Sequence, residues 1–268
     1  GHVITYFAHR IPNANPFQVG IGGGPEHLPG ASTFFTAQTE SNATAILNTT
    51  QTRYIVSNAY MAHSIQEVMA VWNLEDTNLY QTPIVVSGSQ QFAPTLHYFG
   101  TMESRLHIFD TSGLTQYRLI HESEPNPNTI GGSQEQRIKY LYNFIHKKLP
   151  IPVTNTGYIK IFEHVPGATI SATSPLPDNT SILIHLNITT NQNRHFDYIQ
   201  YTTVQNNAFT FTVPYSTTGS IPSGTQFDTI PNGSYTIACA KYAYSLHITE
   251  EDVMSGKTIH ITFPGVQS

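Results

Sequence analysis

The stretch Ser181-Ile182-Leu183-Ile184-His185-Leu186-Asn187-Ile188-Thr189 places an apolar side chain at every second position. A period of two is typical of a β-strand that buries one face. Shorter segments of the same kind recur after residue 157, with Gly, Pro and Asn between them. They cover residues 158–162, 198–204, 209–213, 234–240, 244–248 and 258–263. This spacing predicts that the C-terminal part is an antiparallel β-sandwich or a barrel-like unit.

The N-terminal part has a different pattern, in which helical and strand-like segments are mixed. Apolar spacing and capping residues predict helices, and short apolar runs predict strands. The predicted helices cover residues 32–47, 60–72, 96–109 and 133–148, and the predicted strands cover 53–56, 83–86 and 116–121. Pro150 and Pro152 mark a boundary, so we expect a mixed α/β central unit over residues 1–152 and a β-rich peripheral unit over 153–268. The predicted fold class is α+β.

Composition limits the kinds of partner that this chain of 268 residues can bind. Only 11% of its residues are charged and the net charge is −5, without a dense Lys/Arg cluster, so nucleic acid is an unfavourable partner. The polar, uncharged composition is typical of an extracytoplasmic protein. The single cysteine, Cys239, excludes an intramolecular disulfide and is expected to be a buried strand thiol. No run approaches eighteen apolar residues, so we expect no membrane span within the chain.

Motifs for catalysis or metal binding are missing from the sequence. Thirteen histidines are scattered over both halves without His-Glu-x-x-His spacing, so no metal site is predicted. There is no Gly-x-Ser-x-Gly elbow, and Glu67, Glu75 and Asp76 are expected to be solvated carboxylates. Five Asn-X-Ser/Thr sequons are also present, close to the number that chance predicts, and they would be glycosylation acceptors only where exposed. They start at Asn42, Asn48, Asn179, Asn187 and Asn232.

Two N-terminal segments give further expectations. Pro12 and Pro16 predict an extended connector, and the cluster Gly20–Gly24 is expected to make that connector mobile. In the predicted helix 60–72, the side chains of Met61, Ile65, Val68 and Trp72 are spaced to share one face. On the pattern alone, that face is the buried stripe of an amphipathic helix.

Several blocks, spread over nearly the whole chain, carry a family resemblance. They are Gly1-His2-Val3-Ile4, Ala8-His9-Arg10-Ile11-Pro12-Asn13-Ala14-Asn15-Pro16-Phe17-Gln18, Arg53-Tyr54-Ile55-Val56 with Tyr60-Met61-Ala62, Arg105-Leu106-His107-Ile108-Phe109-Asp110, Tyr117-Arg118-Leu119-Ile120-His121-Glu122-Ser123, Tyr158-Ile159-Lys160-Ile161-Phe162-Glu163-His164-Val165-Pro166-Gly167-Ala168 and Phe211-Thr212-Val213-Pro214-Tyr215-Ser216-Thr217. In this order, the set resembles the C-terminal domain of the archaeal oligosaccharyltransferases, the AglB family.

The resemblance implies a membrane-bound glycosyltransferase that moves an oligosaccharide from a dolichol phosphate carrier to Asn of Asn-X-Ser/Thr acceptors. It implies a divalent metal, Mn²⁺ or Mg²⁺, held by the transmembrane half and not by this chain. The chain would then be an extracytoplasmic domain at the outer face of the cell membrane, monomeric and inactive alone. It would contribute to recognition of the acceptor polypeptide.

The resemblance also suggests three residues for the acceptor site. Gly1 would be the last residue of the Trp-Trp-Asp-Tyr-Gly signature. The helix 60–72 looks like the Met/Ile type of the second family motif, with Met61 and Ile65 bordering the acceptor pocket, while Val68 and Trp72 are expected to stay in the core. The alternative is a cell-surface β-sandwich adhesion or binding module with an α/β cap, which composition and strand spacing fit equally well.

Overall fold

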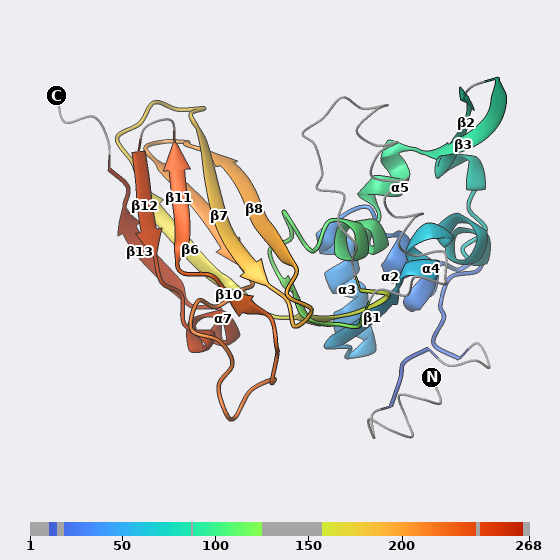
Figure 1. Ribbon diagram of the computed structural model, residues 1–268, viewed down its shortest axis with the longest axis horizontal. Helices are drawn as coiled ribbons and strands as arrows, with labels where there is room; N and C mark the ends of the chain where they lie inside the picture. Colours follow the sequence, from blue (N-terminus) through green and yellow to red (C-terminus); the bar gives the residue numbers. More distant parts are fainter. Residues whose placement is uncertain (1–10, 15–18, 87, 125–156, 240–241, 265–268) are drawn as a thin grey trace. The chain divides into compact units, whose positions relative to one another are not determined.

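The computed structural model describes residues 11–14, 19–86, 88–124, 157–239 and 242–264 (Figure 1). The chain divides into two compact units. Of the described residues, the first unit holds those up to Arg53, then Ser57–Phe109, with Glu124 and 157–159. The second unit holds Tyr54–Val56, Asp110–Ser123 and the described residues from Lys160 on. The predicted boundary at Pro150 and Pro152 and the predicted helix 133–148 lie outside the described residues.

The first unit begins with two short helices in place of the single helix predicted over residues 32–47. These are α2 (Ala31–Thr36) and α3 (Glu40–Thr50). The prediction was wrong because Thr39 adopts an extended conformation and its side chain accepts a hydrogen bond from Asn42 N, which starts a new helix. α3 ends at Gln51, which has φ 51°.

The rest of the first unit is built from short segments. In chain order they are α4 (Ala59–His63), the π-helix η1 (Gln66–Ala70), the 3₁₀-helix η2 (Thr77–Leu79), the hairpin β2 (Gln81–Val86) and β3 (Ser89–Pro94), α5 (Leu96–Gly100) and the π-helix η3 (Ser104–Ile108). The strand predicted over 83–86 is confirmed as β2. The helix predicted over 96–109 is interrupted at Thr101, which takes up φ −64° and ψ 150°. Among the described residues, every helix is too short or too polar to cross a membrane.

Two of the strands predicted in the central unit, over residues 53–56 and 116–121, lie in one three-stranded sheet. Its order is β1 (Tyr54–Asn58), β5 (Ile159–His164) and β4 (Tyr117–Glu122). β4 and β5 pair antiparallel, with a register shift between Leu119 and His121. Ile120 takes up the extra position, as in a β-bulge.

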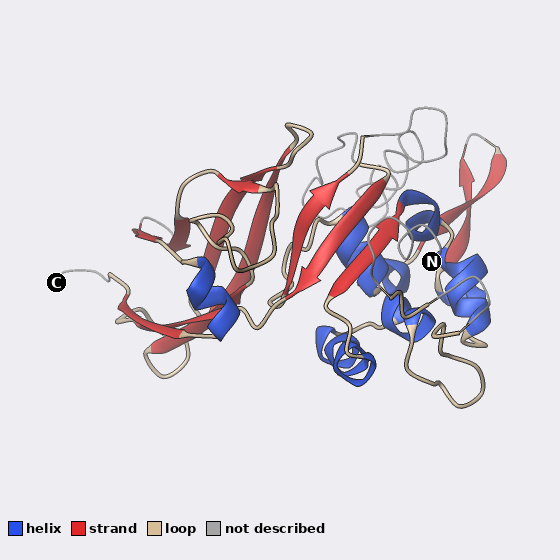
Figure 2. Ribbon diagram, turned by 90° about the horizontal axis from the view of Figure 1, so that it is seen from below, coloured by secondary structure: helices blue, strands red, loops and turns tan. Residues whose placement is uncertain are grey.

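The second unit contains the predicted sandwich, and strands predominate in it, whereas helices predominate in the first unit (Figure 2). One sheet has the order β13 (Thr258–Thr262), β6 (Ala168–Thr173), β9 (Ala208–Val213). The other contains β7 (Ser181–Thr189), β8 (His195–Thr203), β10 (Ile230–Pro231), β11 (Tyr235–Cys239) and β12 (Tyr242–Leu246). The α+β class is confirmed, and the described strands form no closed barrel.

The inward faces of both sheets form one hydrophobic core. On β7 the buried residues are Ile182, Ile184, Leu186 and Ile188, which are the apolar positions of the alternating stretch. Cys239 is buried at the end of β11, as expected. Burial of apolar area at about 25 cal/mol per Å² is the main source of stability for such a layer.

Three elements of the second unit were missed by the sequence patterns: β6, the two-residue strand β10 and the helix α7. β6 follows the turn at Gly167, where the chain needs φ 78°. The helix α7 (Glu250–Ser255) has a capping box in which Thr249 and Asp252 bond each other's backbone. The Thr-x-x-Asp spacing is the sequence signal that identifies it.

Buried charges connect three elements of the second unit. The Arg118 guanidinium donates two hydrogen bonds of 2.7 Å to Glu250 on α7 and bonds of 2.6 and 2.9 Å to Oε2 of Glu163 on β5. All three side chains are at most 1% exposed. A buried carboxylate without its cation is costly, so each of these groups depends on the others.

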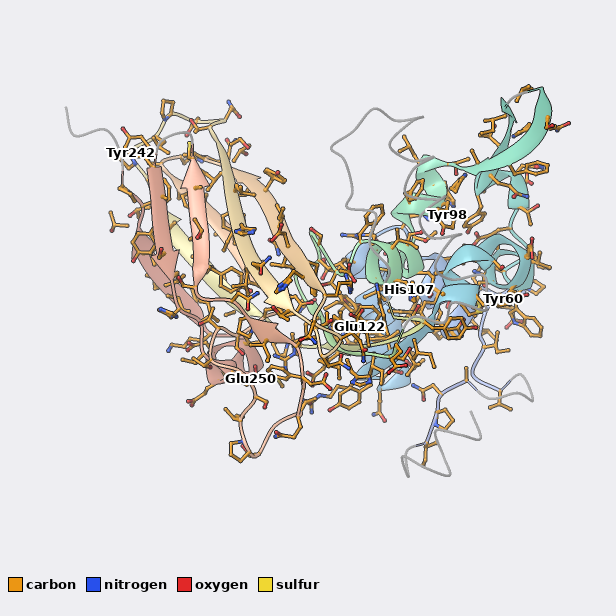
Figure 3. The ribbon with its side chains drawn as sticks, viewed as in Figure 1. Tyr60, Tyr98, His107, Glu122, Tyr242 and Glu250 are labelled. Atoms are coloured by element: carbon orange, nitrogen blue, oxygen red, sulfur yellow. The ribbon has the colours of Figure 1, made fainter. Side chains whose placement is uncertain are left out.

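A second buried network lies at the ends of β4 and β8. The Arg194 guanidinium contacts both Asp110 and Glu122, and the Lys160 ammonium lies 2.7 Å from Asp110. Burial alone would raise the pKa of Glu122, but the hydrogen bonds and charge of Arg194 outweigh it and lower that pKa below its ordinary value. Glu122 and Glu250 are labelled in Figure 3.

We predict that Arg118→Leu lowers the free energy of unfolding by about 3–5 kcal/mol at pH 7, because Glu163 and Glu250 lose their buried partner. Urea titration at pH 7 measures the loss. Lys257→Met is the control, since the Lys257 side chain is 61% exposed in its pair with Asp252, and the substitution should change stability far less. Equal losses in both variants would contradict the role of burial.

Candidate functional site

The expected acceptor residues Met61 and Ile65 lie in and just after the short helix α4, which follows β1 directly. Ser57 and Asn58 end the strand, and the Asn58 side chain caps the helix by accepting a hydrogen bond of 2.9 Å from Met61 N. The next amide, Ala59 N, donates to Tyr158 O at 2.8 Å. The backbone is therefore fixed on both sides of the turn where α4 begins. Met61 lies in this short helix and is half-buried.

Ile65, the other expected residue, lies in the core of the first unit. Its side chain is 0% exposed and packs in a cluster with Ala70, Tyr80, Tyr98 and Phe99. The Tyr98 hydroxyl also donates a hydrogen bond of 2.6 Å to Ala62 O, which ties α5 to the end of α4 (Figure 3). Ile65 therefore supports the element that carries Met61 and has no exposed surface of its own.

The four side chains predicted to share one face do not do so. Val68 and Trp72 are 38% and 36% exposed, so their expected place in the core is wrong. The cause is the backbone. Ser64 leaves the helical conformation with φ −117°, and η1 then continues as a π-helix, whose wider turn shifts every later side chain around the axis.

Gly1, the third expected site residue, lies outside the described residues. The structure therefore brings Met61 and Ile65 together on the same short segment, and it leaves the placement of Gly1 as an expectation.

A buried polar cluster lies behind the start of α4, and sequence reasoning missed it. The Ser57 hydroxyl donates to Oε1 of Glu103 and lies 2.8 Å from Nδ1 of His107. All three residues are at most 1% exposed. Glu103 and His107 are four residues apart at η3, the helical spacing that brings side chains together, and that spacing is the only signal the sequence offers.

This cluster does not have the arrangement of a catalytic triad. In a triad the histidine lies between the serine and the acid, so that it can take the serine proton. Here Ser57 bonds directly to both Glu103 and His107. Because the hydroxyl is also covered, the cluster is better explained as an anchor that holds the strand end preceding α4.

Burial changes the acidity of Glu103. The cost of desolvating the charge raises the pKa of this carboxyl to about 8, although the hydrogen bond from Ser57 works in the opposite direction. Oε2 of Glu103 has no hydrogen-bond partner among the described residues. A neutral carboxyl tolerates such an orphaned oxygen better than a carboxylate does. At neutral pH the Glu103 carboxyl is therefore mostly protonated.

The glycine cluster forms main-chain hydrogen bonds with other parts of the first unit, and the mobility of the connector stays an expectation. Gly24 N donates to Trp72 O at 3.1 Å, and the Trp72 indole donates to Gly22 O at 2.7 Å. Ser32 N and Oγ both donate to Ile21 O. Side chains of the segment are indeed sparse, but main-chain groups supply the contacts.

A hollow of about 530 Å³ lies beside these contacts. It is lined by Gly22, Gly23, Gly24, Pro25, Glu26, Leu28, Val71, Trp72 and Leu74. Its volume is in the range of small-molecule sites, but its lining offers a single ionisable side chain, Glu26. Specific binding needs several convergent polar groups, so we assign no chemistry to this hollow.

Metal ligands do not gather in the part of the chain that the structure describes. It contains no group of three or more His, Cys, Asp or Glu side chains close enough to hold an ion. Several of its buried acids are instead engaged by Arg or Lys. No chemical step is therefore assigned to a metal on these residues.

Glu103→Gln should remove a pH dependence of stability. Because the folded-state pKa of about 8 exceeds the ordinary 4.5, the folded protein holds a proton that the unfolded chain releases. This contribution is complete below about pH 4.5 and falls by at most about 1.4 kcal/mol per pH unit up to about pH 8. The free energy of unfolding of E103Q, relative to wild type, should therefore rise between pH 5 and pH 8. Glu67→Gln, at an exposed position, is the control for removal of a carboxyl group that is not buried, and a flat difference for E103Q would contradict the assignment.

Gly23→Ala and Gly24→Ala form a matched pair. Both glycines have φ near +70°, so both substitutions carry the same backbone strain, about 1 kcal/mol. An added Cβ at Gly23 would lie 2.4 Å from Oδ1 of Asn73, whereas at Gly24 it meets nothing within 4 Å. Thermal unfolding should show that G23A costs at least about 1 kcal/mol more than G24A. Equal losses would mean that the loop does not pack against Trp72 and Asn73.

Comparison with known proteins gives a consistent result along the chain. The family model of the archaeal glycosylation protein B long peripheral domain matches residues 167–259, and the AglB core domain matches residues 1–62. A dolichyl-phosphooligosaccharide-protein glycotransferase 3 of Archaeoglobus fulgidus is 32% identical over 97% of this chain and 36% of its own length. The glycotransferase AglB of Haloferax volcanii is 26% identical over 98% of this chain and 32% of its own length. The chain thus spans about a third of the curated relatives that it matches.

Solved structures agree with the sequence comparisons. The A. fulgidus AglB in complex with an inhibitory peptide and a dolichol-phosphate aligns with a TM-score of 0.88 and 29% identity, over 99% of this chain and 37% of that one. The A. fulgidus oligosaccharyltransferase tethered to an acceptor peptide containing the NVT sequon aligns with a TM-score of 0.85 and 30% identity, over 98% and 37%. The chain therefore belongs to the archaeal oligosaccharyltransferase (AglB) family, in which it corresponds to the C-terminal domain.

Proposed function

We propose that this chain is the extracytoplasmic domain of a membrane enzyme that transfers an oligosaccharide from a dolichol phosphate carrier to Asn of Asn-X-Ser/Thr sequons. The observation that carries the proposal is the likeness over nearly the whole chain to a relative solved with a peptide and a dolichol-phosphate. Within that enzyme, the chain contributes to binding of the acceptor polypeptide. A tethered NVT acceptor in another solved relative supports a peptide substrate of this kind.

The chemistry of the transfer assigns the reactive parts to the rest of the enzyme. The acceptor amide nitrogen bonds to C1 of the first sugar and loses one proton, the bond from C1 to the phosphate oxygen breaks, and the phosphate leaves with the electron pair and can take up that proton. The described residues offer no cluster of acids for a cation, so a divalent metal, Mn²⁺ or Mg²⁺, would be held elsewhere. A relative solved in complex with Zn and sulfate agrees with a metal-binding enzyme without identifying the ion. The chain alone should transfer no glycan.

We assign acceptor recognition to the segment that starts at α4. Met61 is the accessible member, since its side chain is only half-buried. Ile65 is a positioning residue, because it is covered and packs under the same segment. The hydrogen bonds of Asn58 to Met61 N and of Ser57 to Glu103 hold the backbone there. Such fixed backbone is what a binding site on a short helix requires.

The proposal also includes the setting of the domain. We place it at the outer face of the cell membrane, as a monomer, without nucleic acid as a partner. The low charge content of 11% and net charge of −5 support this setting. The alternative of a cell-surface adhesion module shares the sandwich but is not favoured, because the comparisons extend through the helical first unit as well.

The test uses the full-length parent enzyme and two acceptor peptides that differ only in Thr or Ser at the third sequon position. Contact with the Thr methyl contributes on the order of 0.8 kcal/mol, which is roughly a fourfold preference in kcat/KM. We predict that Met61→Ala brings the ratio of kcat/KM for the Thr peptide to kcat/KM for the Ser peptide closer to one. Ile65→Ala should also narrow it, and the conservative Ile65→Val should restore most of it.

Two controls separate recognition from stability. Val68→Ala changes an exposed side chain of the same segment and should leave the ratio unchanged. Ile65→Ala also opens a cavity and should lower the free energy of unfolding by about 2–4 kcal/mol. A loss of stability by itself lowers the rate of transfer to both peptides by the same factor and leaves the ratio unchanged. If both Met61→Ala and Ile65→Ala enzymes stay folded and keep the wild-type ratio, the acceptor assignment is wrong.

A further inference from the structure

The five sequons of the chain differ in whether their reactive groups are free. Glycosylation of asparagine uses the side-chain Nδ2, and recognition of a sequon uses the hydroxyl two residues later. A sequon in a folded protein is therefore a good acceptor only when both groups are exposed and not already hydrogen-bonded.

Two of the sequons lie on the sandwich and are mutually bonded. Asn187 Nδ2 donates to Asp197 at 2.8 Å, and Asn232 Nδ2 donates to both Asn187 and Thr189. Thr189, the hydroxyl of the Asn187 sequon, also lies 2.9 Å from His195 Nδ1. A glycan on either asparagine would replace a proton now used in these bonds.

Two more lie within α3, the sequons of Asn42 and Asn48. Their backbone is part of the helix, so recognition as an extended segment requires the helix to open. The hydroxyl of the Asn48 sequon is also engaged, since Thr50 Oγ1 donates to Ile46 O at 2.9 Å.

The remaining sequon, Asn179-Thr180-Ser181, occupies an exposed turn between β6 and β7. Asn179 has φ 66°, which points it out of the regular strand path, and its side chain is exposed. Its Oδ1 accepts a hydrogen bond of 3.0 Å from Gln205 Nε2. Its Nδ2 and the exposed Ser181 Oγ have no hydrogen-bond partner among the described residues. In this sequon alone, among the five, the nitrogen and the hydroxyl are both exposed and uncommitted.

We propose that Asn179 is the N-glycosylated residue of this chain. A polyprenyl-phosphate-linked sugar is the donor. A bond forms between Nδ2 and C1 of the sugar, the bond from C1 to the phosphate oxygen breaks, and the polyprenyl phosphate leaves with the electron pair and takes up the amide proton. The product keeps one N–H and the Oδ1 bond to Gln205, so the glycan points to solvent without loss of a protein hydrogen bond. Recognition requires that the turn separates from Val204, to which it makes two backbone bonds, of 2.8 and 3.0 Å, and that Ser181 at the start of β7 leaves its pairing with Thr203.

The donor and the compartment of this reaction rest on the proposed function. The test is therefore made in an archaeal host whose own surface proteins are N-glycosylated, with a secreted reporter that carries an Asn-X-Thr sequon. The full-length parent is purified from its membranes, digested with chymotrypsin and analysed by glycopeptide mass spectrometry. We expect the occupancy of Asn179 to be at least several-fold higher than that of each other sequon.

Variants identify the groups that matter. Asn179→Gln and Ser181→Ala should abolish the modification, and Ser181→Thr should keep it. Thr180→Ala breaks the turn bond of 2.6 Å to Pro177 O but retains the sequon, so it should keep the modification as well. A bare Asn179 beside a glycosylated reporter overturns the inference and leaves the proposed function untouched. Modification of another sequon in preference to Asn179 overturns it equally.

Discussion

Arg118 is the constraint on which the second unit depends. Its guanidinium is buried, and a buried cation is tolerated only when carboxylates meet it with good geometry. Glu163 on β5 and Glu250 on α7 do so from two other elements. Their positions are thereby coupled to β4, so three segments distant in the sequence have to adopt one arrangement. Hydrophobic burial supplies the stability of the sandwich, and the charges select which strand and helix ends meet.

In the first unit, the main constraint is that a short helix has to be held in place by its surroundings. α4 has only five residues, too few to be stable by itself in water. Its start is held by the Asn58 cap and the buried cluster of Ser57, Glu103 and His107, and its end by the Tyr98 hydroxyl. A protonated Glu103 makes this possible, because the neutral carboxyl can be buried next to a serine and a histidine without a counter-ion.

The sequence predicted the sandwich better than the helical unit, for a physical reason. The alternation of apolar and polar residues follows directly from which side chains are buried. The strand predicted over Ser181–Thr189 has the same bounds as β7 in the structure. Helical periodicity assumes an uninterrupted α-helix, and Ser64 and Thr101 interrupt it with non-helical backbone. The π-helix η1, which follows Ser64, moves Val68 and Trp72 to the surface. Met61 and Ile65 could be singled out through family resemblance, whereas the Ser57, Glu103 and His107 cluster depends on contacts across about fifty residues, which no local pattern contains.

The parallel pairing of β13 with β6 bears on how the chain folds. Thr258 to Thr262 lie beside Thr169 to Thr173, so the sheet joins residues about ninety positions apart. Such a contact closes a long loop, and native contacts of large sequence separation slow folding. During synthesis, β6 and β9 have to wait for β13 to emerge, with one edge of β6 unpaired until then. The sandwich is thus completed only after β13 has been made, and until then the nascent domain exposes an open strand edge.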